Sequence, residues 1–99
     1  MHGANRHRGE ALVAGHLLRP TFTALVAAED ELGPLFALVE RAAGGQMRLT
    51  EMVALFWHCL VTRPVGLTRE AFGETVAESG LATATPALKA LLGQILSGR

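Results

Sequence analysis

The sequence predicts a mainly α, or α+β, fold: a compact bundle of four or five short helices with a short N-terminal β-hairpin. Three observations carry this prediction. Apolar residues make up 49% of the 99 residues, which is enough for a core. They recur at helical spacings of three and four along most of the chain. Glycine and proline break the pattern into short segments. We expect one domain at residues 9–99, behind a flexible leader at 1–8.

The first element is predicted as a hairpin. Residues 10–13 and 16–19 read as two short extended pieces around Ala14-Gly15. Pro20 keeps Arg19 extended, because a residue before proline disfavours the helical conformation. Ala-Gly is a poorer hairpin turn than Asn-Gly, and Leu17-Leu18 breaks the alternation. An irregular N-terminal arm is therefore the alternative.

Two helices are predicted next. Thr21 suits the N-cap of the first, whose apolar side carries Phe22, Leu25, Val26 and Leu32. Gly33 can stop this helix, and Pro34 suits the first position of the second. The second helix then runs to Gly44-Gly45.

The remaining helices follow the same logic. Thr50 is the expected cap of the third helix, which is apolar on most sides and should be the most buried. Thr68 caps a fourth helix from Arg69 to about 78, and Gly80 stops it. Thr85-Pro86 begins or kinks the last helix. Its apolar stripe is Leu88, Leu91, Leu92, Ile95 and Leu96.

Charge and composition argue against several classes of function. Nine basic residues balance nine acidic ones, so no basic face is available for nucleic acid. A helix-turn-helix regulator stays a remote alternative, since the most apolar helix cannot be both core and recognition helix. No apolar run is long enough to span a membrane, and a single cysteine forms no internal disulfide. We expect a non-enzymatic protein of the bacterial cytoplasm.

The residues that could carry chemistry do not converge. His58 and Cys59 are neighbours on a helix and point about 100° apart, which disfavours a shared metal or a Cys–His pair. We expect Cys59 in the core and His58 on the surface or half-buried. Glu29-Asp30-Glu31 reads as a solvated or partner-facing acidic patch. Neither a catalytic residue nor a cofactor is predicted.

A series of short motifs runs along the chain: LLRPTF at 17–22, Ala24-Leu25, EDELG at 29–33, LTEM at 49–52, FWHCL at 56–60, LTRE at 67–70, and Gly80-Leu81 before a leucine-rich helix. This series resembles the tail-assembly-chaperone-like proteins of gene transfer agents and related prophages of alphaproteobacteria. The resemblance covers residues 9–98.

The resemblance implies a role in building a phage-like tail. As a chaperone, the protein would keep the tape measure protein soluble until tail tube subunits polymerise around it, with the major tail tube protein as a second partner. The alternative is a structural tube subunit that stays in the finished virion-like particle. The surplus of apolar residues fits either role. We expect core and partner surface to meet at Leu18, Arg19, Phe22, Phe56, Trp57, Leu88, Leu92 and Ile95.

Overall fold

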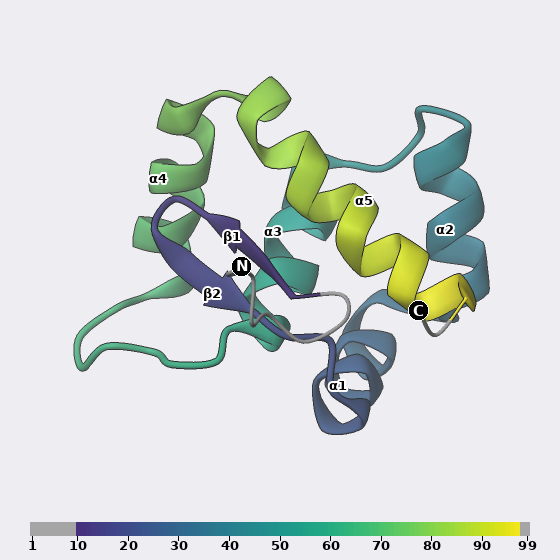
Figure 1. Ribbon diagram of the computed structural model, residues 1–99, viewed down its shortest axis with the longest axis horizontal. Helices are drawn as coiled ribbons and strands as arrows, with labels where there is room; N and C mark the ends of the chain where they lie inside the picture. The colour runs from purple at the N-terminus through teal and green to yellow at the C-terminus, as the bar shows by residue number, and fades with distance from the viewer. Residues whose placement is uncertain (1–9, 98–99) are drawn as a thin grey trace, which may run out of the picture.

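The computed structural model describes residues 10–97, which form five helices and one two-stranded antiparallel sheet (Figure 1). The elements in chain order are β1 (Ala11–Val13), β2 (His16–Leu18), α1 (Phe22–Leu32), α2 (Leu35–Ala43), α3 (Leu49–Cys59), α4 (Arg69–Ser79) and α5 (Leu81–Ser97). This confirms the predicted fold class, hairpin included. The predicted leader at 1–8 lies outside the described residues.

The hairpin turn uses a strained residue. Ala14 has a φ of 50° and Gly15 a φ of 79°, so both turn residues are left-handed. A two-residue hairpin loop needs this backbone to match the twist of its strands. Glycine adopts it freely, whereas alanine does so at a cost. The turn forms because Ala11 pairs with Leu18 across the strands and both are buried.

The hairpin is held to the helices by its second strand. Leu18 forms an isolated antiparallel bridge with Leu60, just after α3. The Arg19 amide donates to the Cys59 carbonyl at 2.7 Å, and the Val61 amide donates to the Leu17 carbonyl at 3.0 Å. The segment at and just after the end of α3 thus pairs with β2, and these extra bonds hold the short strands in place.

The caps of α1 and α4 confirm the predicted signals. The Thr21 hydroxyl accepts from the Ala24 amide at 3.1 Å, and the Thr68 hydroxyl accepts from the Ala71 amide at 3.0 Å. Each satisfies an amide that the first helical turn leaves without a partner. Pro34 is the N-cap of α2 and not its first residue, so that helix begins one position later than predicted.

The predicted cap of the third helix is wrong. Arg48, and not Thr50, is the N-cap of α3. The Arg48 carbonyl accepts the first helical bond, from Met52, and the Glu51 carboxylate accepts from the Arg48 amide at 2.9 Å. Glu51 therefore supplies the return arm of a capping box and fixes the start of the helix two residues early.

The last helix begins at Leu81, and Pro86 lies inside it. Proline lacks the amide proton for one helical bond, which usually ends or bends a helix. Here Ala84 and Ala87 are both buried against the core. Their burial keeps the first turns of α5 in place across Pro86, so the helix does not begin at Thr85-Pro86.

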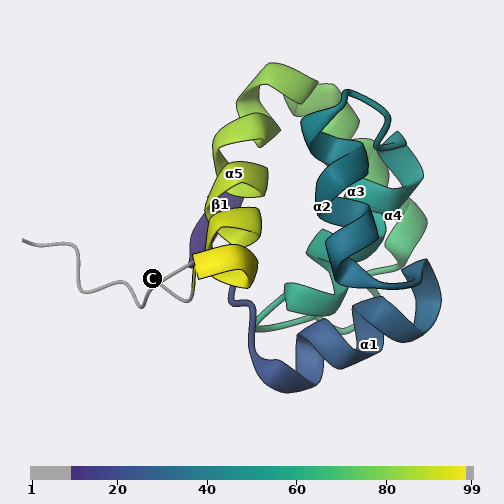
Figure 2. The ribbon, with the colours of Figure 1, turned by 90° about the vertical axis from the view of Figure 1, so that its right-hand side faces the viewer.

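The core is organised around α3, as predicted. Six of its eleven residues are buried, and it packs against both α1 and α4. Figure 2 shows α5 and β1 on one side of the molecule and α2, α3 and α4 on the other. The largest completely buried side chains are Phe56, Phe72, Leu18, Leu38, Leu55 and Leu91. No helix among residues 10–97 is both long and apolar enough to cross a bilayer.

Candidate functional site

Large apolar side chains lie exposed where the first two helices meet. Phe22 is 82% exposed at the start of α1, and Phe36 is 73% exposed at the start of α2. Val26 is also exposed, and Ile95 of α5 is half-buried beside them. Together these side chains line an apolar hollow of about 250 Å³. We call Phe22, Val26, Phe36 and Ile95 the Phe22–Phe36 face.

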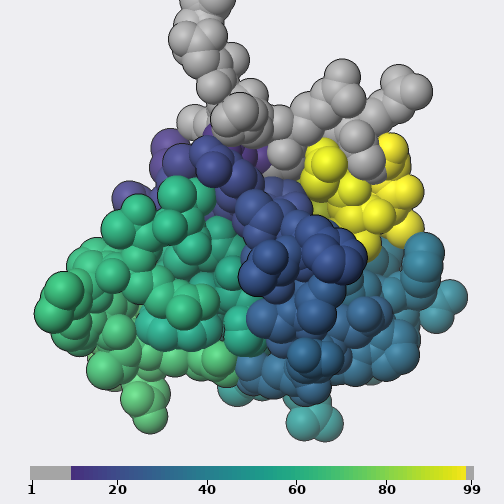
Figure 3. All heavy atoms as spheres, turned by 90° about the horizontal axis from the view of Figure 1, so that it is seen from below, coloured from purple at the N-terminus to yellow at the C-terminus, as the bar shows by residue number. Residues whose placement is uncertain are grey.

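The local backbone brings this face together. Thr21 caps α1 so that Phe22 is its first residue, and the break at Gly33-Pro34 folds α2 back against α1. The Glu29 carboxylate, also at the hollow, accepts from the Leu35 amide at 3.1 Å and fixes the start of α2. Figure 3 shows α1 and α2 in blue beside the yellow end of α5 on one surface.

The apolar side of α1 is only partly buried. Of Phe22, Leu25, Val26 and Leu32, the two leucines pack against the core and the other two are exposed, while the most buried residues of this helix are Ala24 and Ala28. Two alanines one turn apart let the backbone of α1 approach α3 closely. The larger side chains are then displaced toward the rim or into solvent.

The structure does not bring all the predicted partner residues together. Leu18 and Phe56 are completely buried, so no partner reaches them on the folded protein. Arg19 is half-buried and forms an ion pair with Glu10. Phe22 and Ile95 meet at the hollow.

The other predicted positions lie elsewhere. Leu88 lines a second hollow, between the end of α2 and the first half of α5, and Leu92 is half-buried against the core. Phe36 and Val26 were not among the predicted residues. No sequence signal marks Phe36 as exposed, because its helix spacing fits a core position as well.

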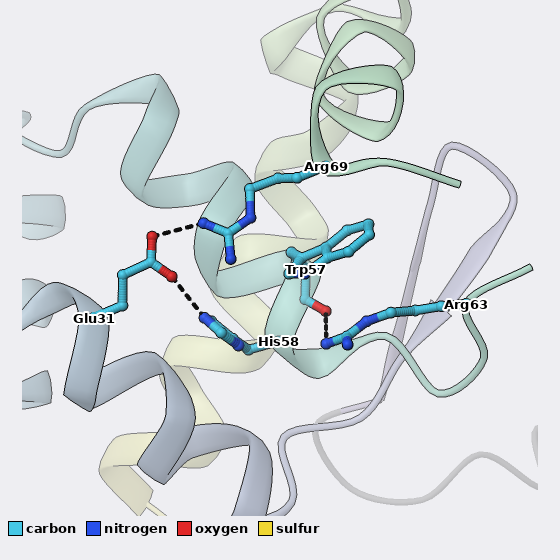
Figure 4. A network of polar contacts seen from close by, with 5 residues as sticks. All are labelled: Glu31, Trp57, His58, Arg63 and Arg69. Carbon is cyan, nitrogen blue, oxygen red and sulfur yellow. Dashed lines mark hydrogen bonds and ion pairs between the residues drawn. The ribbon is translucent and has the colours of Figure 1, made fainter. Parts of the chain in front are cut away.

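Trp57 has a structural environment that the sequence did not reveal. The Arg63 guanidinium carbon lies 4.7 Å from the centre of the indole ring, and that of Arg69 lies 5.9 Å from it. Arg63 also donates to the Trp57 carbonyl at 3.0 Å (Figure 4). Phe72 lies 6.1 Å away, centre to centre. The indole therefore links the 61–68 loop and α4 to α3 by cation–π and aromatic contacts.

A polar cluster centred on Glu31 joins three helices. Glu31 at the end of α1 binds His58 of α3, with 2.8 Å from Oε1 to Nε2. It also accepts from Arg69 of α4, with 2.6 Å from Nη1 to Oε2 (Figure 4). The hydrogen bond from Arg69 and then that from His58 hold the pKa of Glu31 below its usual value.

The predicted acidic patch therefore has internal roles. Glu31 anchors α1 to α3 and α4, and Glu29 accepts from the first amide of α2. Asp30 remains exposed. All three residues are exposed, as expected of a solvated face, and the two glutamates also bind partners within the fold. A partner-facing role of the patch stays a prediction.

The remaining candidate chemistry is in the core. Cys59 is buried as predicted, and burial raises the pKa of its thiol to about 12. At neutral pH this thiol is almost entirely protonated and is a poor nucleophile. His58 is half-buried, also as predicted. Within residues 10–97, no three His, Cys, Asp or Glu side chains are grouped so as to hold a metal ion.

Comparison with known proteins places the chain among phage tail proteins. Residues 11–98 match a family model described as "Phage tail tube protein, GTA-gp10". The match covers nearly the whole chain, hairpin and all five helices included. No curated protein and no solved structure matches the chain.

Proposed function

Because the chain belongs to the phage tail tube protein family described as GTA-gp10, we propose that it is a non-enzymatic subunit of a phage-like tail. In this proposal it attaches to another tail protein through the Phe22–Phe36 face. The family description supports the tube subunit, which the sequence analysis gave as the alternative to a chaperone.

One observation carries the proposal: two phenylalanines of one small domain lie mostly in water on the same face. Exposed aromatic groups of this size gain most when another surface covers them. A stable interface covers on the order of 800 Å² on each partner. Two rings of about 200 Å² each supply less than this. The partner must therefore extend beyond the hollow, over polar residues of α1 and α2.

The chaperone reading remains as a second candidate, for a specific reason. The hollow on the Phe22–Phe36 face is apolar, open and bounded by three helices, which suits one apolar side of a client helix. The tape measure protein would be such a client. A chaperone releases its client when the tube assembles, whereas a tube subunit stays.

The experiment that separates the two is quantitative mass spectrometry of purified particles from cells that express this chain. A tube subunit occurs at a fixed ratio to the other tail proteins after extensive washing. A chaperone is missing from the particles and copurifies with unassembled tape measure protein from the lysate. The second result would overturn the tube proposal.

Co-expression gives an independent check. The chain and the tape measure protein are produced together, with a matched culture that carries the variant Phe36→Ser. For a tube subunit, the amount of soluble tape measure protein does not depend on this chain. A chaperone raises that amount, and the Phe36 variant raises it less.

A further inference from the structure

A third hollow, which is apolar, lies between α3 and α4, away from the Phe22–Phe36 face. Its volume is about 470 Å³. Leu49 and Val53 of α3 form one wall, and Gly73 and Ala77 of α4 form the other. Leu49 is 45% exposed although it is a leucine on a packed helix. We propose that this hollow is a distinct docking surface for a partner helix that carries an apolar side chain flanked by lysine or arginine.

Gly73 is the first reason. It lies in the interior of α4, where glycine is less favourable than alanine, and its φ is not in the left-handed region. A Cβ at this position would lie 3.4 Å from Val53 Cγ1, which is ordinary van der Waals contact. Neither the backbone nor a clash therefore requires glycine here. An alanine methyl group would add bulk beside Val53, where both residues line the hollow.

The shape of the wall indicates a helical occupant. Gly73 and Ala77 are four residues apart, so they lie one above the other on the same side of α4. Small residues in this arrangement let a second helix approach closely. An apolar side chain of that helix can then enter the hollow between the α3 wall and the α4 wall.

The charge at the rim of the hollow favours basic residues on the partner helix, on either side of its apolar side chain. Glu70 and Glu74 of α4 line the hollow and are exposed, and within residues 10–97 neither forms an ion pair. They are one turn apart, where like charges repel each other. Glu70 also favours the start of the helix through the dipole, but Glu74 has no such role. Arg69, the one basic residue at the hollow, is bound to Glu31.

The rim is thus acidic and the floor is apolar. A helix with lysine or arginine one turn apart, on either side of an apolar residue, matches both features. This docking surface depends on neither the Phe22–Phe36 face nor the assignment to a tail, so either proposal can fail without the other.

The test is an NMR titration of the ¹⁵N-labelled full chain with two synthetic peptides. Both are acetylated and amidated amphipathic 14-residue helices with a central leucine. One has lysines flanking that leucine, and the other has glutamates in their place. Circular dichroism establishes that the two are equally helical. The lysine peptide is expected to shift the Gly73 and Ala77 amides saturably and to bind at least about fivefold more tightly than the glutamate peptide.

Two sets of variants sharpen the test. Gly73→Ala is expected to weaken binding of the lysine peptide at least about threefold. Gly93→Ala, which also replaces a helical glycine, is expected to leave that binding unchanged. The double variant E70Q/E74Q should remove most of the difference between the peptides without filling the hollow. It keeps the test decisive if a variant at Gly73 does not fold.

Several outcomes would overturn the proposal. Equal affinity for both peptides would remove the role of the acidic rim. Shifts confined to Phe22 and Phe36 would place the binding on the other face. Gly73 shifts that depend on protein concentration without peptide would make the occupant a second copy of this chain. No saturable binding at millimolar peptide would exclude the site.

Discussion

Replacing both exposed phenylalanines should separate folding from assembly. The perturbation is the double variant F22S/F36S on the Phe22–Phe36 face. A phenylalanine side chain offers roughly 200 Å². Since Phe22 is 82% exposed and Phe36 is 73% exposed, the fold covers only a small part of each. At about 25 cal/mol per Å², this covered part contributes on the order of 1 kcal/mol to folding per residue.

The effect on assembly should be much larger. If a partner covers most of the remaining surface, roughly 150 Å² per ring, the apolar gain reaches an upper limit of about 4 kcal/mol for each. Ordering costs on binding reduce this figure. A loss of about 2 kcal/mol or more is typical of an aromatic at the centre of an interface, and it corresponds to roughly 30-fold weaker binding.

The assays are urea unfolding for stability and the copy number of the variant in purified particles for assembly. Val65→Ser is the matched control, because Val65 is a fully exposed apolar residue in the 61–68 loop. We expect the double variant to stay folded and to be depleted from particles, while the control behaves as wild type. Normal entry of the double variant into particles, or equally strong depletion of the control, would show that this face does not drive assembly.

Four further predictions concern stability and reactivity. Ala14→Asn should raise the free energy of unfolding by about 0.5–1 kcal/mol, since asparagine tolerates the left-handed backbone before Gly15. A lower free energy of unfolding, measured by urea denaturation, would contradict this. Phe72→Ala should cost about 3–5 kcal/mol, because the ring is completely buried, and a calorimetric melt within a few degrees of wild type would be inconsistent with it. Cys59, whose pKa burial raises to about 12, should react with iodoacetamide at pH 8 only after unfolding; rapid native labelling would disprove it. Glu31→Gln should cost about 0.5–1 kcal/mol at pH 7, since the side chain is 39% exposed. The fold lowers the pKa of Glu31, so its contribution is present above about pH 4.5 and is lost as the pH falls through the lower folded value; a difference from wild type that grows toward acid would have the wrong sign.

Local signals in the sequence predicted most of the secondary structure. Thr21 and Thr68 act as caps because their hydroxyl groups satisfy amides within three residues, which is a local interaction. The error at the last helix arose because a distant contact outweighed a local preference. Pro86 lies inside α5 because the turns around it are buried, and no pattern near residue 86 contains that information.

The candidate site was harder to predict than the fold. The apolar spacing of α1 did not show which of its residues are buried, because close packing on α3 buries Ala24 and Ala28 and leaves Phe22 and Val26 exposed. Glu31 meets Arg69 across 38 positions in the chain. Such a pairing depends on how the helices are arranged, and periodicity does not report that arrangement. Phe22 is exposed, as a partner residue must be, and its role in binding stays a prediction.

Photo-crosslinking in purified tails shows whether the chain is a tail subunit attached through the Phe22–Phe36 face. A photoreactive phenylalanine analogue replaces Phe36 in one culture and Val65 in another, and the crosslinked products are identified by mass spectrometry. We expect position 36 to crosslink to another tail protein and position 65 not to do so. Crosslinks from position 65 alone, or particles that contain none of the chain, would contradict this expectation.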